Sequence, residues 1–441
     1  MVNGRRPVPK AQAGDAPTPD GPQLGAGGGR SGASRARRRG SVHPRRRRVL
    51  QVLGAVVVLL LVWVGISLGR AFMAPTSNSA AATVAEWARD HHLGIVVGTL
   101  EKIQYRLNPP KVGGVPDAQA LAQMSAGPTA VAPAFPSEPA QVRPSAPHVA
   151  RPSPAGPTPA PVHAALRPLV TPALPGEGVF HPEVVVNGSP VLQAAYLRPD
   201  SAQSSYLAGV VWMDHRATRW ALHPGYEDPG NLARWSQPDR IPPAQRADLL
   251  ATFNGGFKTN ESRGGFYENG HSAGELINGA ASLVIYSDGH VGLGAWGSDV
   301  TMTPQVSAVR QNLKLMIDKG RIVANLQDNV RSDWGRTLGG GYAVWRSGVG
   351  ITSTNDIVVV MGNSLTAQAL ADLLLDAGAV RGMEMDINPE WMSFMWYTPT
   401  GNPTRPEPHK LVAFNQPADR YFSANSRDFF AVHLRPSPAA K

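Results

Sequence analysis

Apolar positions form one long uninterrupted block near the start of the chain. Val49–Gly69 contains no charged residue over 21 positions. As a helix at about 1.5 Å per residue, this block is roughly 30 Å long, which matches the hydrocarbon core of a bilayer. A cleaved signal peptide and a buried core helix are the alternatives, but a signal's apolar region is usually about 7–15 residues. We therefore expect a permanent transmembrane helix over residues 49–73.

The next apolar pattern has helical spacing and covers residues 80–108. Between Thr83 and Leu107, apolar residues recur every three or four positions. Gly94 and Gly98 weaken one continuous helix, so two short helices are equally possible. The segment is either a small docking element on the main domain or a membrane-proximal stub.

Residues 109–175 lose this periodicity and contain 17 prolines. Such a composition predicts a semi-rigid linker that reaches at most roughly 200 Å in polyproline II form. That length suits a tether through a cell wall, although an inert spacer has the same composition.

Residues 176–441 alternate short apolar runs with turn signals, as a folded domain requires. Two hairpins are predicted, one turning at Asp288-Gly289 and the other at Lys319-Gly320.

One strand–helix–strand unit stands out within this domain. Asp356–Met361 predicts a strand, a helix follows and closes at Gly378, and a second strand runs from Gly382. This arrangement predicts a crossover and a parallel pair, with Asn363 and Asp386 beyond the carboxyl ends of the strands, where ligands gather. The fold class is therefore α/β or α+β with a mixed sheet.

Charge is distributed very unevenly along the chain. The net charge is +10, and residues 1–48 hold 12 basic residues against two acidic ones, so the remainder is electrically balanced. Overall basicity is therefore no sign of nucleic-acid binding. The basic tail predicts a cytoplasmic N-terminus, membrane lipid as the partner of residues 49–73, and an extracellular C-terminal domain. The chain has no cysteine, which excludes disulfides and thiolate metal sites.

Two carboxylates, Glu384 and Asp386, lie on an otherwise apolar predicted strand. Because they are two residues apart, we expect both to face the same side. Carboxylates are rarely buried unless paired, and glycoside cleavage commonly uses two carboxyl groups. Both are candidate catalytic residues; the alternative is that one of them pairs with a buried Arg.

Arg346 lies between apolar segments, where an Arg either binds an anion or closes an internal ion pair. The nearby run Gly339–Gly341 predicts either a phosphate-binding nest or, more simply, a tight turn.

Asn254, Gly255 and Gly256 follow a short apolar run. Asn tolerates a left-handed backbone and glycines permit close approach, so this passage is either a ligand contact or a simple turn. Its position at the end of a strand favours ligand contact.

Taken in order, these passages resemble the phosphodiester glycosidase family, which includes the enzyme that uncovers mannose 6-phosphate by removing N-acetylglucosamine. The resemblance is carried by Asn254–Phe257, a strand over Ser282–Val291, an Arg-Ser passage over Arg346–Gly350, a helix over Ala369–Gly378, and Asp386.

The resemblance extends over about residues 182–430. It implies a membrane-tethered hydrolase that cleaves a sugar from a phosphodiester or related glycosidic linkage in a cell-wall glycan or glycolipid. It implies that Asp386 is the principal carboxylate and Glu384 its possible partner. Arg346 would then hold the anion and Asn254 would position the sugar.

One departure from the family pattern follows Asp386. Family members continue with Gly-Gly-Gly-Ser, whereas this chain continues with Ile-Asn-Pro-Glu-Trp, and Pro389 lacks a backbone donor. Asn388 and Glu390 could replace the lost contacts, and Trp391 is either a face for a sugar ring or a core residue. The alternative function is a catalytically inactive polysaccharide-binding or assembly factor; a scaffold that binds partners through the N-terminal arm is a third.

No zinc site is predicted, because the histidines lack ligand spacing. Asp318, Asp328 and Asp333 could hold a divalent cation such as calcium, although surface acids explain them more simply. No other cofactor is expected.

Overall fold

The computed structural model describes residues 44–73, 80–93, 96–97, 99–100, 103, 107–125, 163–324, 326, 333–335 and 343–436. The chain divides into two compact units, Met1–Trp63 and Val64–Lys441. The predicted apolar helix forms as α1 (Pro44–Met73), and its segment Arg48–Met73 is long and apolar enough to cross a membrane.

The membrane-proximal segment forms a shorter helix than its periodicity allows. Helix α2 spans Ala80–Asp90 and ends in a turn at His91 and His92, where His92 has a φ of 63°. The break therefore precedes Gly94 and Gly98, and the described residues from Val96 to Leu107 are again helical, as in the alternative of two short helices.

The segment predicted as a semi-rigid linker, residues 109–175, contains folded structure at both ends. Ala118–Ser125 forms helix α4 near the linker's start. At the other end Leu166 is buried, and its N–H donates to the carbonyl of Gly178 at 2.9 Å, so the folded domain begins before residue 176. Residues 126–162, which hold most of the prolines, lie outside the described part.

Three antiparallel sheets make up the folded unit. The large sheet has the order β1 (His181–Val186), β2 (Ser189–Leu197), β3 (Ala208–Met213), β14 (Ile357–Leu365), β13 (Val344–Thr352), β15 (Ala379–Glu384), β11 (Leu315–Asp318), β12 (Arg321–Ile322). The second sheet has the order β17 (Glu407–Lys410), β16 (Phe394–Thr398), β5 (Leu249–Asn254), β18 (Phe429–Leu434), β4 (Thr218–His223). The third has the order β7 (His271–Ala273), β6 (Phe266–Glu268), β10 (Val306–Gln311), β8 (Ala281–Tyr286), β9 (Val291–Ala295).

Both predicted hairpins are confirmed as β8–β9 and β11–β12. Their turns contain Gly289 at φ 81°, and Lys319 and Gly320 at φ 51° and 71°. The two successive positive values at Lys319 and Gly320 are those of a two-residue hairpin turn, and in both turns glycine adopts positive φ without steric cost.

The strand–helix–strand unit forms as β14, α5 (Ala367–Asp376) and β15. The Thr366 side chain caps α5 by accepting from the N–H of Ala369 at 2.9 Å, and Gly378 follows with φ 93°. Strands β14 and β15 run in the same direction, but β13 lies between them and pairs antiparallel with both. The two strands of the predicted pair are therefore parallel but are not hydrogen-bonded to each other, and Asn363 lies within β14 instead of beyond its end.

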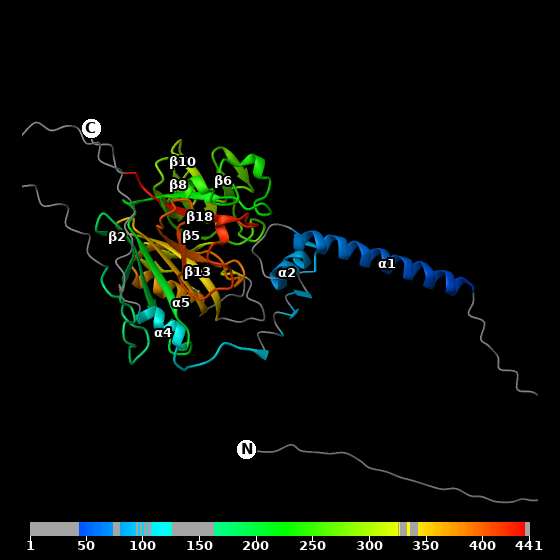
Figure 1. Cartoon of the computed structure of the whole chain (residues 1–441), viewed down its shortest axis with the longest axis horizontal. Helices are drawn as coiled ribbons and strands as arrows, with labels where there is room; N and C mark the ends of the chain where they lie inside the picture. The colour runs from blue at the N-terminus through cyan, green and yellow to red at the C-terminus, as the bar shows by residue number, and fades with distance from the viewer. Residues whose placement is uncertain are drawn as a thin grey trace, which may run out of the picture. The chain divides into compact units, whose positions relative to one another are not determined.

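The sheets pack as layers, with the third and second sheets above the large sheet and α5 below it in the view of Figure 1. Strand β14 shows why, because successive side chains point to opposite faces. Val358 and Val360 pack with Leu370 of α5, whereas Val359 and Met361 join the core shared with the second sheet.

A fully buried ion pair joins the third sheet to the second. Arg310 at the end of β10 donates from Nε to Asp428 Oδ2 at 2.7 Å, and both side chains are 0% exposed. The same guanidinium donates from Nη1 to the carbonyl of Gln311 at 2.7 Å, and from Nη2 to the carbonyl of Phe257. A charge pair with these additional hydrogen bonds is tolerated in the interior, whereas an unpaired charge is not.

We predict that Asp428→Asn lowers the free energy of unfolding by about 3–5 kcal/mol, because Arg310 is left as a buried uncompensated charge. Thermal unfolding of the full-length chain in detergent measures this change. The control is Arg216→Gln at a pair whose Arg side chain is 71% exposed, where the loss should stay below about 1 kcal/mol. Equal effects at the two sites would contradict the importance given to the buried pair.

Candidate functional site

Arg346 and Glu384 form an internal ion pair on neighbouring strands. The Arg346 Nη1 group donates to Glu384 Oε1, and the two side chains are 3% and 0% exposed. Arg346 also donates from Nε to the carbonyl of Leu365 at 3.0 Å and from Nη1 to that of Trp334 at 3.1 Å. Burial raises the pKa of Glu384 to about 7, and the guanidinium opposes this rise. Of the two alternatives for Arg346, the structure shows the internal ion pair.

Asp386 lies two residues after β15 and has a different environment. Its Oδ1 accepts from the N–H groups of Ile387 at 2.7 Å and Asn388 at 2.9 Å, while its Oδ2 is 3.9 Å from Nη2 of Arg427. Burial raises the pKa of Asp386 to about 6, although Arg427 and the two N–H groups oppose the shift. Because β15 ends at Glu384, the regular alternation stops, and the two carboxylates contact different arginines.

Asn254 is held by the protein at every polar atom of its side chain. Its Nδ2 donates to the carbonyl of Gly255 at 2.8 Å and to Ser347 Oγ at 3.2 Å, and its Oδ1 accepts from the N–H of Ser393 at 3.1 Å. A Cβ at Gly255 would lie 2.1 Å from Asp428 Oδ2. The predicted close approach to the backbone at Gly255 is found, but the atoms that approach it belong to the protein itself.

Asn312 connects this passage to the end of β15. It is fully buried, accepts from the N–H of Phe257 at 3.0 Å, and donates to the carbonyls of Glu384 at 2.7 Å and Met385 at 2.9 Å. A Cβ at Gly256 would lie 2.7 Å from its Oδ1. Sequence reasoning missed Asn312, because no motif surrounds it.

Side chains of the loop after Asp386 form hydrogen bonds within the loop and with Asn415. Asn388 Oδ1 accepts from the N–H of Glu390 at 3.0 Å, and Glu390 Oε1 accepts from Asn415 Nδ2 at 2.8 Å. These two residues therefore stabilise the turn that Pro389 stiffens.

Trp391 is 3% exposed, which agrees with the alternative that it is a core residue. Two guanidinium groups lie over its ring, that of Arg420 at 5.3 Å and that of Arg427 at 5.0 Å from the centroid. Its ring therefore positions Arg427 by a cation–π contact and leaves no open face for a sugar.

Arg427 and Lys258 are cationic groups of this region that sequence reasoning did not assign. Lys258 Nζ is 2.8 Å from Glu86 Oε1 and 3.0 Å from Asp90 Oδ1, and Arg427 Nη1 is 3.5 Å from the same Glu86 oxygen. The signal for Arg427 was its position in the loop before β18, because loops carry a disproportionate share of binding residues. Together with Asp386 these groups form the candidate site.

The two predicted calcium ligands that the structure describes each lie beside an arginine. Asp318 lies 3.6 Å from Arg381, whereas Asp333 pairs with Arg263 at 2.9 Å. Asp328 lies outside the described residues, as does the run Gly339–Gly341.

One other cluster of Asp and His has the spacing for a cation. Ligand atoms of Asp214, His215 and Asp356 lie within 4.8 Å of one another. Asp214 already accepts from Arg216 at 2.9 Å, and Asp356 accepts from Thr354 at 2.7 Å and contacts His215 at 2.9 Å. Because the carboxylates have these partners, we assign no metal there.

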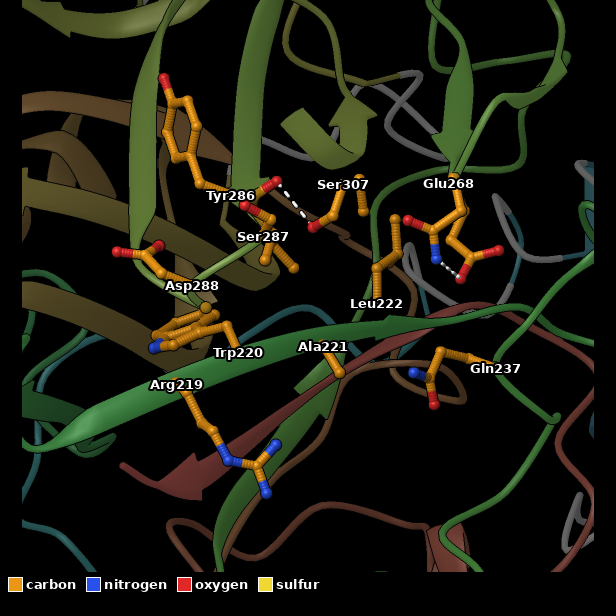
Figure 2. A pocket seen from close by; sticks show the side chains of 14 residues that line it. Arg219, Trp220, Ala221, Leu222, Gln237, Glu268, Tyr286, Ser287, Asp288 and Ser307 are labelled. Carbon is orange, nitrogen blue, oxygen red and sulfur yellow. Dashed lines mark hydrogen bonds between the residues drawn. The ribbon is translucent and has the colours of Figure 1, made fainter. Parts of the chain in front are cut away.

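A cavity of about 340 Å³ lies between β4 and the strands β8 and β10. Figure 2 shows Trp220 and Arg219 on opposite sides of β4, as strand alternation requires. Glu268 at its edge accepts from the N–H of Ser236 and from Asn269 Nδ2, each at 2.9 Å. The lining includes the predicted turn at Asp288-Gly289 but none of the candidate site residues, and both of its carboxylates, Glu268 and Asp288, already accept hydrogen bonds.

The raised pKa of Asp386 predicts a measurable pH dependence of stability. A carboxyl whose folded pKa is about 6 instead of 3.8 binds its proton more tightly in the folded state, so stability falls as the pH rises from about 4 through 6. Asp386→Asn keeps an acceptor for the two N–H groups and cannot ionise.

We expect the wild type to lose on the order of 2–3 kcal/mol relative to this variant between pH 4 and pH 7.5. The measurement is thermal unfolding of both proteins across this range. A constant difference between them at all pH values would contradict the shifted pKa.

No known protein family and no curated protein matches the sequence. Among solved structures the chain is similar to a hypothetical protein from Synechocystis, with 11% identity over 57% of this chain and 63% of that one and a TM-score of 0.33. It is also similar to a candidate exported protein from Burkholderia pseudomallei K96243, with 12% identity over 52% and 74% and a TM-score of 0.30. The chain spans less than two thirds of the Synechocystis protein, and a likeness of this degree assigns neither family nor activity.

Proposed function

We propose that this protein is a membrane-tethered glycoside hydrolase that cleaves a sugar from a phosphodiester or related glycosidic linkage in a cell-envelope glycan or glycolipid. One observation carries the proposal: the carboxylate of Asp386 is buried, is oriented through Oδ1 by two backbone N–H groups, and directs Oδ2 toward Arg427. Perturbed carboxyls of this kind concentrate at functional sites.

A phosphodiester substrate explains how one carboxylate can suffice. Ordinary glycosides leave as alcohols, which need a general acid, so glycosidases use a second carboxyl group. A sugar phosphodiester monoanion loses the sugar to give a phosphate monoester dianion, whose conjugate acid has a pKa of about 6, far below that of an alcohol, so this group departs without a general acid. Asp386 would then act as base or nucleophile, and Glu384 would stay in its ion pair with Arg346.

Arg427 takes the anion-binding role that the resemblance gave to Arg346. Its guanidinium lies between Asp386 and the Glu86 carboxylate and above the ring of Trp391, so it is already oriented. A preorganised cation in a water-poor site stabilises negative charge on a leaving phosphate at low reorganisation cost. Lys258, which shares the Glu86 oxygen, adds a second positive charge.

The alternative function is glycan binding without turnover. The specific observation in its favour is the loop after Asp386, where Asn388 and Glu390 bond within the loop and with Asn415 and Pro389 offers no donor. Such a loop provides fewer backbone amides for a sugar phosphate than the family's glycine loop.

We expect the full-length protein in detergent to release free sugar from sugar-1-phosphodiesters or isolated wall glycans. Asp386→Asn should lower kcat/KM at least 100-fold, because the base or nucleophile is lost. Activity should rise with pH through about 6, as Asp386 becomes ionised. Sugar release and its pH profile are followed by chromatography.

Glu384→Gln is the matched control. It removes a carboxylate two residues away and, like Asp428→Asn, leaves a buried arginine without its counter-charge, so the rate is normalised to folded protein; sugar release should then persist at 10% of the wild-type rate or more. Full activity of Asp386→Asn would refute the hydrolase mechanism. Glycan binding without release by the wild type would support the alternative function.

A further inference from the structure

Helix α2 places two carboxylates against the cationic groups of the candidate site. Glu86 and Asp90 are one helical turn apart, so they project from the same face of α2. Both contact Lys258 Nζ, at 2.8 Å and 3.0 Å, and Glu86 also lies 3.5 Å from Arg427 Nη1. The side chain of Glu86 is only 8% exposed, so its carboxylate is buried where it contacts these two cations.

Contacts of Trp87, within α2, and of His91, directly after it, fix the orientation of the face that carries Glu86 and Asp90. Trp87 donates from Nε1 to Ser67 Oγ at 3.0 Å, and its ring stacks on His91 at 4.6 Å between centroids. His91 in turn contacts the same Ser67 hydroxyl at 3.2 Å. Because Ser67 belongs to the last turns of α1, these contacts tie α2 to the end of the membrane-anchor helix.

Arg427 is only loosely satisfied by the carboxylates beside it. Its Nη1 is 3.5 Å from Glu86 and its Nη2 is 3.9 Å from Asp386, whereas charge-assisted hydrogen bonds are about 2.7–2.9 Å long. Among the described residues, Arg427 Nε and Nη1 and Glu86 Oε2 are buried without a hydrogen-bond partner. A buried guanidinium with two free donor groups is suited to an anion that offers several oxygens.

We propose that Lys258 and Arg427 form a binding site for the phosphodiester group of the substrate, and that Glu86 and Asp90 of α2 hold this site closed by occupying the ligand's place. The identity of the ligand rests on the proposed function; the anion site and its closure by α2 do not.

Closure by α2 has a defined effect on affinity. A ligand that binds only the open state shows an apparent Kd equal to its intrinsic Kd divided by the open fraction. Removing the two carboxylates should therefore tighten anion binding by the factor by which α2 disfavours the open state. Among the side chains of α2 whose burial is described, the other buried ones are Thr83 and Ala88, which are small, and Trp87 is half-buried.

The test uses full-length protein in a maltoside detergent, which carries no phosphate, with inorganic phosphate as the probe in calorimetric titrations. The double variant Glu86→Gln, Asp90→Asn should bind phosphate at least about 10-fold more tightly than the wild type. Adding Arg427→Gln to this variant should abolish the gain. The control Glu275→Gln, Glu407→Gln removes two negative charges at exposed positions elsewhere, and its affinity should stay within about twofold of the wild type.

A second measurement follows α2 itself. Trypsin cleavage after Arg89, identified by fragment mass, should accelerate when phosphate is added to the wild type. It should already be fast without phosphate in the Glu86→Gln, Asp90→Asn variant.

No affinity gain in the double variant, a gain that survives Arg427→Gln, or phosphate-independent cleavage at Arg89 in the wild type would each overturn this proposal. A chain that binds phosphate as expected but releases sugar from no substrate would keep the anion site and refute only the hydrolase.

Discussion

The geometry of the candidate site depends on the buried ion pair between Arg310 and Asp428. Arg310 is fully enclosed and holds both Asp428 and the carbonyl of Phe257, so the third sheet fixes two separate segments at once. Arg427 directly precedes Asp428 in the chain, and its guanidinium is therefore directed toward Asp386 by a neighbour that cannot move. Loss of this ion pair would release the cation of the site as well as the core.

The buried ion pair also explains Gly255 and Gly256, which the sequence analysis interpreted as part of a ligand-binding passage. Gly255 packs against the carboxylate of Asp428, and Gly256 packs against Asn312, at distances that exclude a Cβ. Asn312 in turn donates hydrogen bonds to the carbonyls of Glu384 and Met385, which directly precede Asp386. The passage Asn254–Phe257 thus supports Asp386 through contacts within the protein, a role different from contacting substrate. This role is compatible with the resemblance of the passage to a family motif.

Local patterns predicted the local structure. The apolar helix, both hairpins and the capped helix α5 depend on neighbours in sequence, and all four form. The partners of the charged residues could not be predicted in the same way. Arg346 meets Glu384 because β13 pairs with β15 in one register, and Lys258 meets Asp90 across 168 positions of sequence. Neither pairing leaves a signal in the composition or periodicity of its own segment.

Burial and catalysis are in conflict at Asp386 unless the site opens. A carboxylate that is 2% exposed does not contact a sugar, yet its two backbone donors and its arginine are arranged as for a reacting group. The chain of contacts from Glu86 through Arg427 to Asp386 resolves the conflict, because the acidic face of α2 occupies the side from which an anionic substrate would approach. On this argument any turnover requires α2 to withdraw, and an anion able to replace both of its carboxylates is the ligand that makes withdrawal favourable.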